Sequence, residues 1–241
     1  MIYFVSDVHL GFHSDARNKK IENILIAFLR KIANDCTDLY IVGDLFDYWF
    51  DYKTVIPGAF YRTLSELSTL KAKNINIEYL VGNHDFGHFR FFEKELGIPL
   101  YYNDITRTHS SKKFYISHGD GKLYNDKGYL ILKKILRNRL ANKLYRLLHP
   151  DCGITLALKI SRHSRDYTDA KSFGKNDGLK DFAEKKIKEG FDYVIMGHIH
   201  QISDIKFAKG KYINLGTWLR EPSFAMFDGK ELQLRKVEEI V

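Results

Sequence analysis

Runs of hydrophobic residues with strand-like and helix-like spacing alternate along the first half of the chain. The strand-like runs are IYFVS at 2–6, DLYIVGD at 38–44 and INIEYLVGN at 75–83, and amphipathic helices are predicted at 18–32 and 60–70. This βαβαβ order is typical of a layered sheet covered by helices. KFYISHGD, near 112–120, predicts one more strand before the pattern changes.

Beyond residue 121 the spacing becomes helical and the polar positions become basic. Leucines recur every four residues from Leu132 to Leu148, with many Lys and Arg between them, which predicts an amphipathic helix over 128–148; a second helix is predicted over 154–162. After a helix at 178–188 and the strand FDYVIMGH, two hairpins turn at Lys209-Gly210 and Asp228-Gly229. The pattern predicts one α/β domain over 1–241, a layered β-sheet flanked by helices and ending in antiparallel strands, with a basic helical cap inserted at 122–175.

Positive charge is concentrated in the predicted cap. The chain of 241 residues carries a formal net charge of +8, and between residues 122 and 175 there are thirteen Lys and Arg against four Asp. The remaining sequence is therefore close to neutral. Such a basic segment favours an anionic partner, and charge alone leaves nucleic acid, an acidic membrane and a phosphorylated substrate open. The other interpretation is a solvated helical face whose leucines pack onto the domain.

Composition argues against several other classes of protein. With 44% hydrophobic residues the chain can bury a core without disulfides or repeats. Its two cysteines, Cys36 and Cys152, stand in unrelated surroundings that predict neither a disulfide nor a thiolate metal site. No apolar run approaches the roughly twenty residues of a membrane span, and the first strand begins directly after Met1, without room for a leader sequence. We therefore expect a cytoplasmic protein that meets lipid only from its surface.

Five short polar blocks, each at the carboxyl end of a predicted strand, carry the candidate chemistry. They are Asp7-Val8-His9, Gly43-Asp44-Leu45-Phe46-Asp47, Gly82-Asn83-His84-Asp85, Ser117-His118-Gly119-Asp120 and Gly197-His198-Ile199-His200. Open α/β sheets bind ligands on loops at the carboxyl ends of strands, so these blocks are expected to converge. Each block alone is typical of a turn or of a hydrogen-bonded surface histidine, whereas five in succession indicate one site.

The side chains in these blocks suit paired metal ions. Carboxylate, imidazole and amide groups without thiolates favour a divalent cation such as Mn, Fe or Zn. In the pairs Asp7-x-His9 and His198-x-His200, alternate side chains can reach one centre. Seven candidate ligands exceed the needs of one ordinary site. Two sites that share a carboxylate would use them all, as in many enzymes that cleave phosphoesters by in-line displacement.

The blocks resemble those of the calcineurin-like metallophosphoesterases, and they span residues 7–200. The resemblance implies one metal held by Asp7, His9, Asp44 and His200 and a second held by Asp44, Asn83, His118 and His198, with Asp44 as the bridge. It implies a hydroxide activated by both metals, with Asp47 and Asp85 orienting ligands or His84. His84 is the candidate catalytic residue, as a proton donor or as a partner of a phosphate oxygen. Asp120 is left unassigned.

Within that superfamily, the chain is similar to the UDP-2,3-diacylglucosamine hydrolases of lipid A synthesis. The similarity rests on YFVSDVHLG at 3–11, GDLFDYWFDY at 43–52, HGDGKLYNDKGY at 118–129 and SRHSRDYTDAK at 161–171. It implies hydrolysis of the diphosphate bond of UDP-2,3-diacylglucosamine to UMP and 2,3-diacylglucosamine 1-phosphate (lipid X), with two divalent metal ions, usually Mn²⁺. The substrate contacts that it implies are Asn83, His84, Asp126, Tyr129, Arg162, Ser164, Thr168, Lys171 and His198.

His84 is the main departure from this family, because the better-known branch carries Arg in that block and GNHD is the pattern of the wider superfamily. A departing sugar phosphate is a stable anion, so charge stabilisation matters more than a proton and either residue would serve. We expect a glycolipid nucleotide substrate, peripheral association with the anionic inner face of the cytoplasmic membrane, and no nucleic acid partner. The alternative is a metallophosphoesterase for nucleotides or nucleic acid. A non-catalytic interaction module ranks lower because no ligand is missing.

Overall fold

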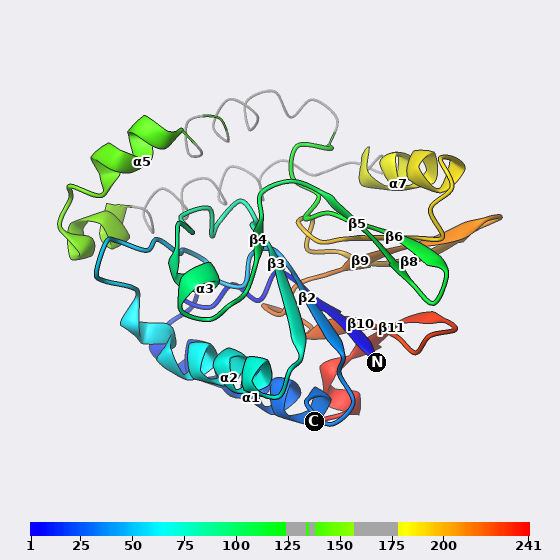
Figure 1. Ribbon diagram of the computed structural model, residues 1–241, viewed down its shortest axis with the longest axis horizontal. Helices are drawn as coiled ribbons and strands as arrows, with labels where there is room; N and C mark the ends of the chain where they lie inside the picture. Colours follow the sequence, from blue (N-terminus) through cyan, green and yellow to red (C-terminus); the bar gives the residue numbers. More distant parts are fainter. Residues whose placement is uncertain (124–133, 135–137, 157–177) are drawn as a thin grey trace.

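Two β-sheets face each other at the centre of the computed structural model, which describes residues 1–123, 134, 138–156 and 178–241 (Figure 1). The first sheet has six strands in the order β11-β10-β1-β2-β3-β4. Their bounds are β1 Ile2–Val5, β2 Asp38–Val42, β3 Asn76–Leu80, β4 Leu100–Tyr101, β10 Ser223–Phe227 and β11 Leu232–Lys236. Strands β1 to β4 are parallel, whereas β10 pairs antiparallel with both β1 and β11.

The second sheet has five strands in the order β5-β6-β7-β9-β8. Their bounds are β5 Ile105–His109, β6 Lys112–Ile116, β7 Tyr193–Met196, β8 Ile202–Phe207 and β9 Gly210–Leu215. The central strands β6, β7 and β9 are parallel, and β5 and β8 form antiparallel edges. The predicted hairpins are confirmed as β8–β9 and β10–β11.

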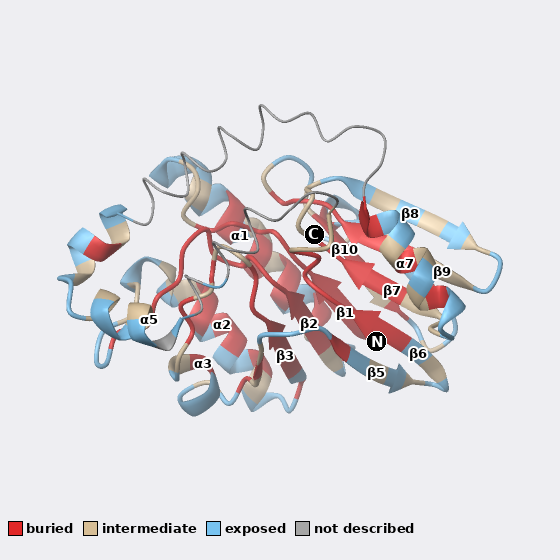
Figure 2. Ribbon diagram, turned by 90° about the horizontal axis from the view of Figure 1, so that it is seen from above, coloured by how far each residue is buried: buried red, intermediate tan, exposed pale blue. Residues whose placement is uncertain are grey.

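Alternation along the strands divides the side chains between two cores. Tyr3, Leu39 and Ile77 lie opposite one another on β1, β2 and β3, and they pack with the helices α1 (Asp15–Ile32) and α2 (Tyr61–Ala72). The next residues along β1 and β2, Phe4 and Tyr40, face the second sheet. Because both faces of these strands are buried, they read as continuous apolar runs (Figure 2).

Helix α7 (Gly178–Lys188) covers the outer face of the second sheet, where it packs on β6, β7 and β9. The molecule is thus layered as helices, sheet, sheet and helix (Figure 1). Three further short helices lie outside the predicted cap: η1 (Gly58–Phe60), α3 (Phe91–Lys94) and η2 (Val237–Glu239). The α/β class and the layered sheet flanked by helices are therefore confirmed.

The described part of the predicted cap comprises α5 (Arg139–Tyr145) and a helical segment at 150–156. It packs against the loop that follows β2, where Tyr145 and Ile154 contact a cluster of Tyr48, Phe50 and Tyr52. The hydroxyl groups of Tyr48 and Tyr145 lie 3.0 Å apart. The remaining residues of the predicted insertion at 122–175 lie largely outside the described residues, so its helical character as a whole stays a prediction.

The prediction of one helix over 128–148 is wrong where the structure describes it. Asn138 has an extended backbone and its side-chain oxygen accepts hydrogen bonds from the amides of Leu140 and Ala141, so a new helix begins at Arg139. Among the described leucines of this stretch, Leu140, Leu144 and Leu147 are 65%, 60% and 81% exposed, so these side chains do not pack onto the domain. In the described part of the chain, none of the helices has the length and apolarity to cross a membrane.

Candidate metal centre

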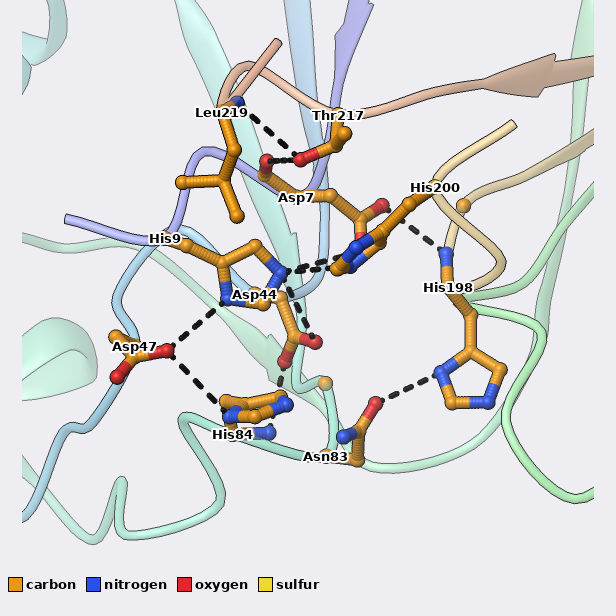
Figure 3. Close-up of polar contacts among 12 residues, drawn as sticks. Asp7, His9, Asp44, Asp47, Asn83, His84, His198, His200, Thr217 and Leu219 are labelled. Atoms are coloured by element: carbon orange, nitrogen blue, oxygen red, sulfur yellow. Dashed lines mark hydrogen bonds and ion pairs between the residues drawn. The ribbon is translucent and has the colours of Figure 1, made fainter. Parts of the chain in front are cut away.

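Loops from both sheets bring all seven candidate ligands to one place. Asp7 and His9 follow β1, Asp44 follows β2, Asn83 follows β3, His118 follows β6, and His198 and His200 follow β7. Because these strands are parallel within each sheet, their carboxyl ends share one edge. Figure 3 shows side chains from the loops after β1, β2, β3 and β7 pointing toward a common centre.

One half of the cluster is formed by Asp7, His9 and His200. The Nε2 atoms of the two histidines lie 2.9 Å apart, and Asp7 Oδ1 lies 3.7 Å from His9 Nε2 and 3.4 Å from His200 Nε2. Asp44 Oδ2 lies 3.9 Å from His9 Nε2 on one side and 3.3 Å from His118 Nε2 on the other. The Asp44 carboxylate is therefore central to the cluster.

The other half is formed by Asn83, His118 and His198. The amide oxygen of Asn83 lies 2.9 Å from His118 Nε2 and 2.8 Å from His198 Nδ1. His118 Nδ1 contacts the carbonyl oxygen of Val42 at 2.9 Å, which fixes the ring so that Nε2 faces the centre. The two halves meet at Asp44, whose carboxylate lies between His9 and His118.

The backbone at these positions is unusual. Asp7, His9, Asp44, His198 and His200 have φ values of 51°, 51°, 54°, 73° and 56°, in the left-handed region that side chains with a Cβ rarely adopt. Each such residue costs of order 1 kcal/mol or more, and such strain gathers at functional sites. The turns that it creates carry the ligand side chains back toward the sheet edge.

Two glycines are required by close approach of side chains. A Cβ on Gly82 would lie 2.1 Å from Asp44 Oδ1, and a Cβ on Gly197 would lie 2.2 Å from Asp7 Oδ2. The amide of His84 donates to Asp44 Oδ1 at 2.8 Å, and the amide of His198 donates to Asp7 Oδ2 at 3.0 Å. The glycines thus let neighbouring loops hold the two carboxylates through backbone hydrogen bonds.

Asp47 and Asp85 act at different distances from the centre. Asp47 Oδ1 lies 3.5 Å from His9 Nδ1 and 3.7 Å from His84 Nδ1, so it faces both rings. Asp85 accepts hydrogen bonds from the amides of Leu45 and Gly82 at 3.0 and 2.8 Å. Asp85 therefore ties two ligand loops together, whereas Asp47 contacts the imidazoles directly.

Charges inside the cluster control its protonation. Although burial favours the neutral acid, the positive charge of His118 holds the pKa of Asp44 well below its usual range. Burial opposes charge on the imidazoles too, but Asp44 raises the pKa of His118 to about 10, and Asp47 and Asp7 raise that of His9 to about 9. Cations that bind here compete with these protons, so metal affinity should fall as the pH falls.

The residues present fit divalent metal ions. Asp7 Oδ1 is buried and has no hydrogen-bond partner among the described residues. Carboxylate oxygens and imidazole nitrogens of Asp7, His9 and His200, and of Asp7, Asp44 and His118, lie within 4.8 Å of one another. His84 also forms such a group with His9 and Asp44, which sequence reasoning did not anticipate. A buried acceptor without a hydrogen-bond partner, among converging ligand atoms, is what a bound cation would satisfy.

Two supporting residues were missed by sequence reasoning. Buried Asn214 donates to the carbonyl of Gly197 at 2.7 Å, and buried Thr217 donates to the carbonyl of Asp7 at 3.0 Å. Both lie in or just after β9, in the stretch INLGTW. Like the other blocks, this stretch places polar residues and a glycine at the end of an apolar strand. It contains no His or carboxylate, so sequence reasoning did not select it.

Six of the expected substrate contacts lie outside the described residues. They are Asp126, Tyr129, Arg162, Ser164, Thr168 and Lys171. The other three, Asn83, His84 and His198, belong to the cluster (Figure 3). His84 lies beside its centre, with its ring 4.9 Å from the ring of His9 and its side chain 14% exposed.

Loops after parallel strands that bring together carboxylate, imidazole and amide groups, without thiolates, are typical of a two-metal phosphoesterase site. Residues 1–202 match the family model described as calcineurin-like phosphoesterase, and the chain belongs to this family of metal-dependent hydrolases, which use a dinuclear metal site. A UDP-2,3-diacylglucosamine hydrolase from Porphyromonas gingivalis is 33% identical over 99% of this chain and 98% of its own. A hydrolase of the same name from Photorhabdus laumondii is 28% identical over 96% of each chain. The solved structure of Yfce, a phosphoesterase from E. coli, is 14% identical, covers 100% of this chain and 94% of its own, and has a TM-score of 0.49.

Proposed function

We propose that this protein hydrolyses the diphosphate bond of UDP-2,3-diacylglucosamine and releases UMP and 2,3-diacylglucosamine 1-phosphate. The observation that carries the proposal is the complete ligand cluster around Asp44 in a chain that is similar over nearly its full length to hydrolases of that name. A diphosphate ester suits the centre because cleavage at one phosphorus leaves a stable phosphate anion.

Asp7, His9, Asp44 and His200 would hold one metal ion, and Asp44, Asn83, His118 and His198 the other. Two bound divalent cations, most often Mn²⁺ in enzymes of this kind, supply a hydroxide nucleophile at neutral pH and neutralise phosphate charge. The protein contributes the rigid geometry. Val42 and Asp47 orient the rings of His118 and His9, so the ligand atoms are in place before the substrate arrives.

His84 is placed to act on the substrate rather than to complete a ligand set. Asp47 Oδ1 lies 3.7 Å from His84 Nδ1, so the ring is oriented by the same carboxylate that faces His9. Its protonated form can place positive charge beside the bridging or terminal oxygens of the diphosphate. Since the departing sugar phosphate is a weak base, charge stabilisation accounts for this role without proton transfer.

The cap segment provides a surface for the acyl chains and for a membrane. Its exposed leucines, Leu140, Leu144 and Leu147, flank the exposed Lys143 in the sequence, and apolar side chains next to a basic one are expected of a segment that lies in an anionic lipid interface. A protein that takes a diacylated substrate benefits from binding at the membrane that contains it. We therefore propose peripheral association with the inner face of the cytoplasmic membrane.

The decisive experiment is to incubate the purified protein with Mn²⁺ and UDP-2,3-diacylglucosamine and to measure UMP and the diacylated glucosamine phosphate. The wild-type protein should release both in equal amounts, and Asp44→Ala should abolish release together with tight metal binding, because both ion sites lose a ligand. Hydrolysis of soluble phosphodiesters without any action on the glycolipid would instead favour an enzyme for nucleotides or nucleic acid. Turnover by Asp44→Ala near the wild-type rate would refute the shared carboxylate.

A further inference from the structure

A cavity of about 270 Å³ opens beside one end of the metal-ligand cluster. It lies between the ends of β3 and β6 and the segment that joins β4 to β5. Its polar lining comes from Tyr102, Asn103, Asp104, His118, Asp120 and Lys122. Because His118 belongs to both the cavity and the cluster, a molecule in the cavity would adjoin the reacting phosphates.

The cavity and the cap lie at opposite ends of the cluster. The rings of His118 and His198 are 5.2 Å apart, and Figure 3 shows His198 on the side of the centre away from Asp47. The cap segment packs on Tyr48 and Tyr52, immediately after Asp47. A diphosphate bound at the centre would therefore extend one substituent toward the cap and the other toward the cavity.

Asp104 gives the cavity a fixed carboxylate. Its Oδ1 accepts hydrogen bonds from Ser117 Oγ at 2.7 Å and from Lys122 Nζ at 2.9 Å, and the hydroxyl of Tyr115 donates to Oδ2. Lys122 is thereby paired, so the cavity holds no strong net charge for a second phosphate. A pre-oriented carboxylate is the group with which nucleotide sites bind ribose hydroxyls.

Tyr102 and Asn103 supply what a nucleobase needs. The hydroxyl of Tyr102 donates to the carbonyl oxygen of His88, which fixes a ring that is 40% exposed. Such a ring offers a surface on which a base can stack. The Asn103 amide is exposed and makes no side-chain hydrogen bond to the described residues. Its donor and acceptor complement the adjacent acceptor and donor on the edge of uracil.

We propose that this cavity binds the nucleoside of the substrate, with the base against Tyr102 and Asn103 and the ribose hydroxyls on Asp104. The inference rests on the proposed function and assigns the two halves of that substrate to opposite ends of the metal centre. Size supports the assignment, since about 270 Å³ is near the lower limit of small-ligand pockets. A diacylated sugar would not fit, whereas a nucleoside is of that order.

Binding of small probes to the metal-loaded protein tests this subsite by calorimetry. UMP should bind more tightly than ribose 5-phosphate, glucosamine 1-phosphate or inorganic phosphate, and 2′,3′-dideoxy-UMP should bind about tenfold more weakly than UMP, the loss expected for hydrogen bonds to a charged group. Asn103→Ala and Tyr102→Ala should each weaken UMP binding about tenfold and leave phosphate binding unchanged. Asn34→Ala, an exposed asparagine at the end of α1, is the matched control and should change nothing.

The outcomes separate this inference from the proposed function. Equal affinity of the wild type for UMP and phosphate, or unchanged UMP affinity in both cavity variants, would overturn the nucleoside subsite even if the glycolipid is hydrolysed. Weakened binding of glucosamine 1-phosphate in the variants would assign the cavity to the sugar and also overturn it. If the glycolipid is not hydrolysed but the variants lose UMP affinity selectively, the subsite stands and the natural nucleotide is a different one.

Discussion

At the scale of single residues, His84 carries the clearest test of substrate identity. Its ring faces Asp47 and lies 4.9 Å from the ring of His9. If its role is electrostatic, His84→Arg should keep activity on UDP-2,3-diacylglucosamine within about tenfold of wild type, while His84→Ala should lose on the order of 10²-fold or more. Initial rates of UMP release measure both.

An alkyl phosphodiester is the control substrate for the His84 variants. Its alkoxide leaving group is a strong base that benefits from a proton, which guanidinium cannot readily give. His84→Arg should therefore fail on this substrate while it still acts on the glycolipid. Equal loss of glycolipid activity in the Arg and Ala variants would show that His84 donates a proton or positions the substrate.

His88 carries a second residue-scale prediction, on pH. Its ring is buried among Trp49, Tyr79 and Phe92, and neither nitrogen has a hydrogen-bond partner in the described part of the chain. Burial lowers its pKa from 6.5 to about 3. Below pH 6.5 His88 binds a proton in the unfolded chain but not in the folded protein. The free energy of unfolding therefore falls as the pH falls, by about 2 kcal/mol at pH 5 relative to neutral pH.

His88→Phe should remove this contribution. Urea unfolding of the metal-free protein at pH 7.5 and pH 5 measures the free energy of unfolding at each pH. Between the two, this free energy should fall by about 2 kcal/mol less in the variant than in the wild type. His149→Gln, which changes an exposed histidine, should behave as wild type. If the free energy of unfolding fell equally in the wild type and in His88→Phe, the His88 ring would have to be protonated in the folded protein.

Site residues could be predicted from the sequence only where the residue type is distinctive. Asp7, His9 and Asp44 stood out because carboxylates and imidazoles follow apolar strands. Asn214 and Asp104 did not, because a lone Asn or Asp near a strand end is typical of a turn. Their importance comes from hydrogen bonds to Gly197, Ser117 and Lys122 that depend on tertiary contacts.

At the scale of elements, helix α5 and the turn after it present exposed leucines with a direct consequence for membrane binding. The side chains of Leu140 and Leu147 are 65% and 81% exposed. Burying a leucine in lipid is worth about 1.5–3 kcal/mol, so the double variant Leu140→Gln/Leu147→Gln should bind anionic vesicles at least tenfold more weakly. Vesicle sedimentation measures the loss. Hydrolysis of a soluble phosphodiester should persist.

Val55→Gln is the matched control, since Val55 is 47% exposed and lies outside α5. It should leave vesicle binding unchanged. Equal binding by wild type and the leucine variant would mean that α5 meets no lipid and that its leucines serve another contact.

Long, strongly periodic elements were predicted well and short ones were missed. α7 was predicted at its observed bounds, and α1 begins at Asp15, three residues before its predicted start. β4 has two residues and β5 alternates with polar ones, so neither shows an apolar run. The break at Asn138 escaped because the leucine spacing continues through it, while the side chain caps a new helix.

At the scale of the whole molecule, the metal-ligand cluster joins the two sheets. Asp7 and Asp44 come from loops of the six-stranded sheet, whereas His118 and His198 come from loops of the five-stranded sheet. Bound cations would therefore stabilise the packing of one sheet on the other in addition to their role in catalysis. The division into two sheets itself was not predictable, because β-strands buried on both faces look alike in sequence.

Metal removal tests this link. At a hundredfold excess over the dissociation constant, bound metal adds about 2.7 kcal/mol to the free energy of unfolding, which for a chain of this size raises the Tm by roughly 5–10 °C. Calorimetric scans with Mn²⁺ and with chelator should differ by that amount. Asp44→Ala should lose most of the difference. An equal Tm in both conditions for the wild type would show that metal does not couple the sheets.

The left-handed backbone at five ligand positions also bears on how this protein can be engineered. A glycine there would relieve of order 1 kcal/mol each at Asp7, His9, Asp44, His198 and His200. A laboratory screen that rewards heat resistance in the presence of a chelator would therefore enrich substitutions that remove the metal ligands, and the most heat-stable variants would be inactive. Selection for a hardier catalyst from this chain must score turnover alongside temperature, or hold these five codons fixed.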